Sequence, residues 1–85
     1  MMTRNKPSGK KIVNKVQEWC DRKGMDKLDF ISKCIGAKVE IDGRKLSYDT
    51  ISRIYDGETN INMITATLIT LALGLDSISE LFDIE

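Results

Sequence analysis

The side chains that could carry out chemistry in this chain are almost all charged, and they argue against catalysis. The sequence has 13 Lys and Arg, 13 Asp and Glu, two Cys and no His, so the most common general base is missing. It has no glycine-rich phosphate loop, no Gly-x-Ser-x-Gly turn and no Cys or His pair at metal-ligand spacing. We therefore expect no enzymatic activity, no cofactor and no metal.

The charges are distributed unevenly along the chain. Residues 1–45 carry 12 Lys or Arg and 6 Asp or Glu, a net charge of +6, whereas residues 46–85 carry 1 and 7, a net charge of −6. This asymmetry is typical of a protein that places one face on a polyanion, although ordinary solvated surface is the alternative. Residues 1–11 lack apolar periodicity, and we predict a flexible basic arm that contains Arg4, Lys6, Lys10 and Lys11.

The elements that would position these charges form a single domain, residues 12–85, because 85 residues cannot support two cores. Apolar residues at helical spacing predict a first helix from Ile12 to Gly24 and a second, capped by Asp26, that runs to Gly36. Cys20 and Cys34 lie on these two apolar stripes, and we expect both to be reduced core residues.

Residues 37–46 interrupt the helical pattern. Val39 and Ile41 alternate with charged residues, and Asp42-Gly43 can supply the two positive φ angles of a tight turn. The pattern predicts either a short β-hairpin or an extended loop as an insert between the second and third helices.

Two further helices are predicted after this insert. Ser47 can cap a third helix that ends at Gly57, and Asn60 or Asn62 can cap a fourth over residues 63–73. The fourth is apolar nearly all round, which predicts a central core helix.

The end of the chain predicts a short fifth helix and a contact with a second copy. Ser77 and Glu80 have capping-box spacing before Leu81, Phe82 and Ile84. Since so short a chain cannot easily bury all three apolar residues at its end, we expect a homodimer that covers them. The sequence thus predicts an all-α fold of five helices with an insert at residues 37–46.

No segment of the sequence predicts a membrane span. The longest nearly apolar stretch, residues 61–75, contains Asn62 and three threonines and is shorter than the roughly 20 residues that a membrane helix needs. The basic N-terminus has no apolar segment behind it, unlike a secretory signal. We expect a cytoplasmic protein that does not bind membranes.

The predicted third helix has the features of a helix that reads DNA. Ile51 and Ile54 lie on one side of it and leave a polar side free, and an α-helix fits the major groove. Arg53 can bond two acceptors of guanine, and Asp49 can accept from cytosine N4. Tyr48 can pack on a thymine methyl group or reach a phosphate. A solvated helix face is the alternative interpretation.

A family resemblance covers the second half of the chain. It is carried by residues 47–57, by Asn60, by Ile69 with residues 72–74, and by residues 79–82. These segments resemble the Cro/CI-type helix-turn-helix regulators, the lambda-repressor-like family also called XRE. The resemblance implies five helices, the third in the major groove, and dimers that read two half-sites. By position, it implies base reading by Tyr48, Asp49, Ser52 and Arg53, and backbone contacts by Ser47, Thr50, Asn60 and Asn62.

The chain departs from the family pattern before the third helix. Family members pass from the second helix to the third through a tight turn of three or four residues, whereas ten residues separate Gly36 from Ser47 here. The insert leaves the angle between the two helices open. It also leaves open whether Ser32 or Ile31 takes the position of the family's small residue in the second helix.

The chain also departs from the pattern after the third helix. Many members have a glutamate where Tyr55 stands, and lysine or arginine where Glu58 and Thr59 stand, which predicts weaker phosphate affinity at that loop. Basic residues in the insert and the arm restore the positive charge, and we expect backbone contacts from Arg44, Lys45, Lys10 and Lys11. On this hypothesis the insert acts as a wing, and a solvated hairpin is the alternative.

These observations predict a bacterial or phage-encoded repressor that binds a pseudo-palindromic operator in double-stranded DNA as a dimer. The alternative is a protein-interaction module of the same fold, such as an antitoxin-like or polymerase-associated adaptor. We expect no small-molecule ligand, because the chain has no second domain to hold one.

Overall fold

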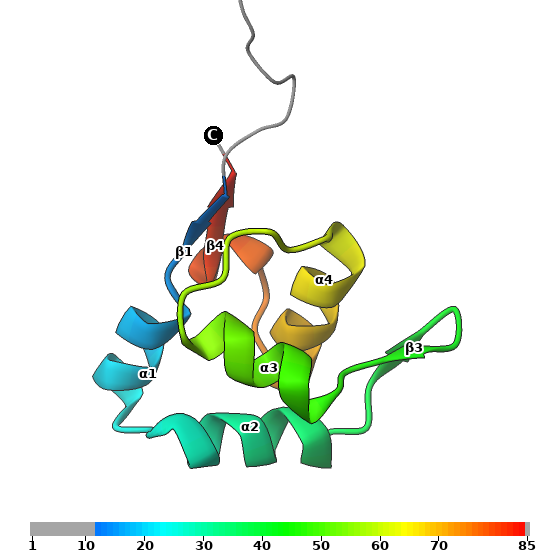
Figure 1. Cartoon of the computed structure of the whole chain (residues 1–85), viewed down its shortest axis with the longest axis horizontal. Coiled ribbons are helices and arrows are strands. Elements are labelled where there is room, and N and C mark those ends of the chain that lie inside the picture. Colours follow the sequence, from blue (N-terminus) through cyan, green and yellow to red (C-terminus); the bar gives the residue numbers. More distant parts are fainter. Residues whose placement is uncertain (1–11, 85) are drawn as a thin grey trace, which may run out of the picture.

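Four α-helices and two small antiparallel sheets make up residues 12–84, the part of the chain that a computed structural model describes (Figure 1). A single 3-10 turn, η1, precedes the last strand. In chain order the elements are β1 (Ile12–Asn14), α1 (Val16–Lys23), α2 (Lys27–Gly36), β2 (Glu40–Ile41), β3 (Arg44–Lys45), α3 (Tyr48–Tyr55), α4 (Met63–Ala72), η1 (Ile78–Glu80) and β4 (Phe82–Ile84).

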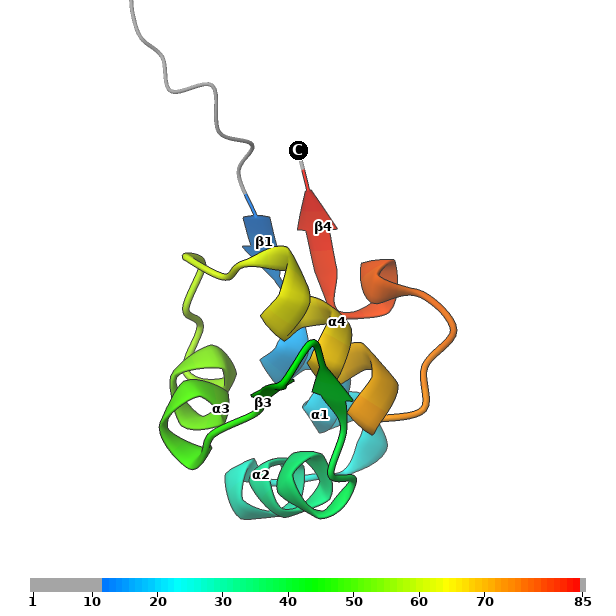
Figure 2. The same cartoon turned by 90° about the vertical axis from the view of Figure 1, so that its right-hand side faces the viewer.

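The prediction of an all-α, five-helix fold is wrong, and both errors lie near the ends of the chain. Residues 12–14, predicted as the start of the first helix, form β1, and the predicted fifth helix is reduced to η1 and followed by β4. β1 pairs antiparallel with β4, with Ile12 opposite Ile84 (Figure 2). Ile12 and Val13 are β-branched residues that favour a strand once a partner strand is present, and that partner lies about 70 residues away.

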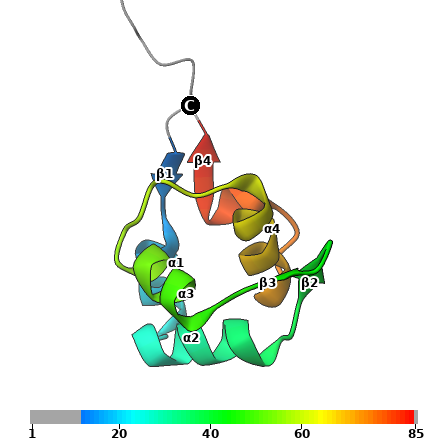
Figure 3. The same ribbon diagram turned by 45° about the vertical axis from the view of Figure 1, so that its right-hand side comes forward.

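The hairpin predicted over residues 37–46 is confirmed. β2 pairs antiparallel with β3, and the turn residues Asp42 and Gly43 have φ angles of 51° and 78°. Two successive positive φ angles give a turn whose twist matches that of the strands. The hairpin projects from the body of the domain next to α4, and an extended segment leads from β3 to the start of α3 (Figure 3); β2 contacts α4.

The predicted starts of the second, third and fourth helices are confirmed. Asp26, Ser47 and Asn62 cap α2, α3 and α4, and each cap side chain accepts a hydrogen bond from the backbone N–H three residues later. Of the two candidate caps for α4, the structure thus uses Asn62 and not Asn60. None of the helices between residues 12 and 84 is long and apolar enough to cross a membrane.

One hydrophobic core joins all four helices to the C-terminal segment. α4 buries only part of its surface in this core, because Met63 and Leu71 are each more than half exposed. The buried members of the core cluster are Val16, Trp19, Cys20, Phe30, Ile31, Cys34, Ile51, Ile54, Ile61, Ala66, Ile69, Leu73, Leu81 and Phe82.

Both cysteines are buried free thiols in this core. Burial raises the pKa of Cys20 from 9.0 to about 11 and the pKa of Cys34 to about 12, with smaller contributions from Asp21 and from the other cysteine respectively. The native state therefore keeps both thiols protonated at a pH where the unfolded chain ionises them.

This difference predicts a loss of stability at high pH. Above pH 9 the unfolded state binds fewer protons than the native state, so the free energy of unfolding falls as pH rises. We expect a contribution of about 1.4 kcal/mol per pH unit for each thiol up to about pH 11. Urea unfolding from pH 8 to 11 measures it. The double variant Cys20→Ala/Cys34→Ala should lack this contribution, and parallel curves for the two proteins would refute it.

Candidate nucleic-acid interface

α3 presents one buried and one exposed face. Ile51 and Ile54 are almost completely buried, and the helix packs against α1 and α2. Of the four predicted base-reading residues, Tyr48, Asp49 and Arg53 are exposed and Ser52 is half-buried. The sequence pattern therefore predicted correctly which side of the helix is exposed.

Arg53 and Asp49, two of the predicted base-reading residues, form an ion pair with each other on this face. The Arg53 Nε donates to Asp49 Oδ2 at 3.2 Å, and a second guanidinium nitrogen forms an ion pair with the same oxygen. The hydrogen bond and the charge of Asp49 raise the pKa of Arg53, with a smaller contribution from Glu58. Exposed ion pairs between residues four apart contribute little to stability. An anion that binds the Arg53 guanidinium more strongly can therefore displace Asp49.

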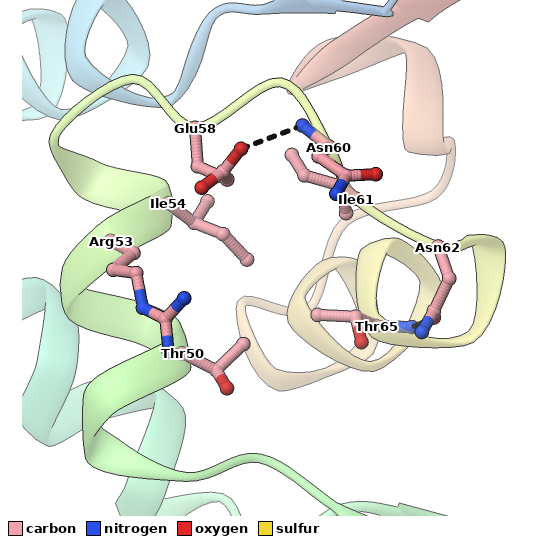
Figure 4. Close-up of a pocket in the computed structure, with 8 residues that line it drawn as sticks. All are labelled: Thr50, Arg53, Ile54, Glu58, Asn60, Ile61, Asn62 and Thr65. Atoms are coloured by element: carbon pink, nitrogen blue, oxygen red, sulfur yellow. Dashed lines mark hydrogen bonds between the residues drawn. The ribbon is translucent and has the colours of Figure 1, made fainter.

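A cavity of about 230 Å³ lies between α3, the loop after it and the start of α4 (Figure 4). The backbone-contact candidates Thr50, Asn60 and Asn62 all line it. Ser47 does not line the cavity, but its hydroxyl donates to the Thr50 hydroxyl at 2.9 Å. The complete lining is Thr50, Arg53, Ile54, Glu58, Asn60, Ile61, Asn62 and Thr65.

The most unexpected lining residue is Glu58. Its carboxylate oxygen accepts a hydrogen bond from the backbone N–H of Asn60 at 2.9 Å (Figure 4). The sequence shows an acid at this position, but only the structure shows that it reaches into the cavity. An anion entering the cavity would meet a negative charge beside the donors of Asn60, Thr50 and Arg53.

The C-terminal end of α3 is held by side chains from three other elements, which sequence reasoning missed. Asn14 of β1 donates to the carbonyl oxygens of Ile54 and Glu58, each at 2.8 Å. Gln17 of α1 donates to the carbonyl oxygen of Tyr55 at 3.2 Å. The Ile54 carbonyl also accepts from the backbone N–H of Gly57 at 3.1 Å, so Asn14 adds a second donor there, whereas Gln17 provides a donor for a carbonyl of the last helical turn.

α2 supplies the third contact at this end of α3. The Lys27 ammonium binds both carboxylate oxygens of Asp56, at 2.9 and 3.0 Å, and lies 6.0 Å from the centre of the Tyr55 ring. The Tyr55 ring also packs on Phe30 at a centroid distance of 5.9 Å. These contacts connect the start of α2 to the end of α3.

The remaining candidates lie in different surroundings. Arg44 and Lys45 are exposed on β3, and within residues 12–84 neither forms an ion pair. Of the two candidates for the small-residue position in α2, Ile31 is buried in the core and Ser32 is exposed. Lys10 and Lys11 lie outside the described residues.

Two of the three proposed dimer residues are buried within the protomer. Leu81 is completely buried and Phe82 is 2% exposed in the core, while the Ile84 side chain lies outside the described part of the structure. The short C-terminal segment does bury these two side chains, because β4 pairs with β1 instead of forming a helix. Leu81 and Phe82 are therefore not available for a dimer contact.

Comparison with known proteins identifies no relative: no family model matches the chain, and neither does a curated protein or a solved structure. Among the described residues, no cluster of three or more His, Cys, Asp or Glu side chains could hold a metal ion. The candidate site consists of the exposed face of α3 and the cavity beside it.

The contacts of Asn14 generate a stability prediction. Asn14→Asp removes both donors and places a carboxylate against two carbonyl oxygens, so we expect the free energy of unfolding to fall by at least about 2 kcal/mol. Asn62→Asp is the matched control, because aspartate caps a helix as well as asparagine does. Urea unfolding compares the two, and equal stabilities would show that Asn14 does not hold α3.

Proposed function

We propose that this protein is a sequence-specific DNA-binding regulator that inserts α3 into the major groove of double-stranded DNA. One observation carries the proposal: α3 is fixed at its C-terminal end and along Ile51 and Ile54, while Tyr48, Asp49 and Arg53 remain exposed. Base reading requires a helix whose buried face is held rigidly by the domain and whose exposed face carries hydrogen-bonding groups.

The residues of α3 and the cavity take separate roles in this proposal. Arg53 and Asp49 contact base edges once DNA separates them, with Tyr48 and Ser52 beside them. Ser47, Thr50, Asn60 and Asn62 contact phosphates, which fix the register of the helix without reading sequence. The resemblance of residues 47–57 to Cro/CI-type regulators supports the same roles, and repression by a dimer at a pseudo-palindromic operator remains part of the proposal.

The hairpin contributes affinity in the same proposal. Arg44 and Lys45 project from β3 next to the start of α3, where they can act as a wing on the DNA backbone. Lys10 and Lys11 would add further backbone contacts. Neutralising phosphates with cations releases counterions, so this contribution depends on salt and not on sequence.

Two carboxylates favour a second candidate, a protein-interaction module of the same fold. Asp49 pairs with the only cation of α3, and Glu58 reaches into the cavity. Selection from random-sequence duplexes at moderate salt separates the two functions. A DNA regulator enriches one motif, whereas a chain that enriches none is better explained as the interaction module.

Arg53→Ala tests the reading face of α3. The variant should lose between about 5-fold and 150-fold in affinity for the selected site and lose preference at one base pair, as expected for one bidentate contact. Arg22→Ala is the matched control, since Arg22 also forms an exposed ion pair with an acid four residues away. An Arg53→Ala variant with an unchanged site profile would mean that α3 does not read bases through Arg53.

The double variant Arg44→Ala/Lys45→Ala tests the wing. Loss of two phosphate contacts should weaken binding to every sequence alike and lower the slope of log K against log salt by about 2. Arg22→Ala/Lys23→Ala removes the same charge from the end of α1 and should leave the slope within experimental error of the wild type. Equal slopes for all three proteins would exclude contact between the hairpin and the backbone.

A further inference from the structure

The backbone N–H and the backbone carbonyl of Glu58 both form hydrogen bonds with other parts of the domain. Its backbone N–H donates to the carbonyl oxygen of Arg53 at 3.1 Å, which closes the end of α3. Its carbonyl oxygen accepts from the side-chain amide of Asn14 at 2.8 Å. Because both backbone groups are bonded, the direction in which this side chain leaves the loop is set by the domain.

The Glu58 carboxylate occupies a position that an anionic ligand would take. It accepts the backbone N–H of Asn60 at 2.9 Å and lines the cavity together with Thr50 and Arg53 (Figure 4). The Asn60 side chain is exposed at the same cavity. One donor that could bind a phosphate oxygen, the Asn60 backbone N–H, is thus already bonded to a carboxylate, which has the same sign of charge and the same acceptor chemistry.

We propose that Glu58 stands in for a DNA backbone phosphate and limits the affinity of the domain. On binding, a phosphate of the duplex displaces the carboxylate from Asn60 and takes over its hydrogen bond. Glu58 must then turn out of the cavity, and its repulsion of the phosphate lowers affinity for all sequences alike. This inference rests on the proposed function, and it assigns to Glu58 a role that the reading face of α3 does not explain.

A purely structural role for Glu58 makes a different prediction. If the carboxylate served only to order the loop, its removal would lower stability and would not raise affinity. Glu58→Gln separates the two roles, because glutamine keeps an acceptor oxygen for the Asn60 N–H and removes the negative charge. Glu58→Ser provides a second neutral variant if Glu58→Gln unfolds.

The first experiment measures the affinity of the full chain for a DNA duplex at several salt concentrations. Glu58→Gln should bind about 5- to 10-fold more tightly than the wild type near 0.1 M salt, the order expected for removing one partly screened repulsion. Glu80→Gln is the matched control, since it changes the net charge equally and Glu80 does not line the cavity. An equal gain in both variants would assign the effect to net charge and overturn the proposal.

The second experiment does not depend on DNA. Inorganic phosphate is titrated into labelled wild-type and Glu58→Gln protein while the Asn60 amide resonance is followed by NMR. The variant should respond at a several-fold lower phosphate concentration, and equal responses would overturn the role of Glu58. If neither protein binds DNA, the proposed function fails, and this titration alone decides whether Glu58 competes with an anion for the Asn60 N–H.

Discussion

The position of α3 depends on the hydrogen bonds at its C-terminal end. This helix has eight residues, too few to be stable alone in water, and only Ile51 and Ile54 are buried within it. Side chains of β1, α1 and α2 converge on its last turn and on the residues just after it. All three contribute N–H donors, and the Lys27 ammonium adds the positive charge that a helix C-terminus favours.

This arrangement holds α3 although a hairpin, and not a tight turn, precedes it. A short turn between two helices would itself constrain their angle, but here β2 and β3 lie between α2 and α3. The pairing of Lys27 with Asp56 and the packing of Phe30 on Tyr55 constrain them at the opposite end. The hairpin projects from the body of the domain and carries two exposed cations, Arg44 and Lys45 (Figure 3).

Signals close together in the sequence predicted most of the elements. The caps Asp26, Ser47 and Asn62 and the turn at Asp42-Gly43 each act within a few residues, so their patterns are legible without the fold. The pairing of β1 with β4 is not local, and the bonds of Asn14 to residues more than 35 positions away leave no pattern. Glu58 was visible as an acid after α3, but its bond to Asn60 required the coordinates.

Amide chemical-shift mapping with a DNA duplex tests the central claim, that the exposed face of α3 is the contact surface, most directly. The account predicts that the largest changes occur in residues 48–53 and at Asn60, where the base-reading and phosphate candidates lie. Changes confined to the outer face of α4 around Met63 and Leu71, with residues 48–53 unaffected, would contradict it.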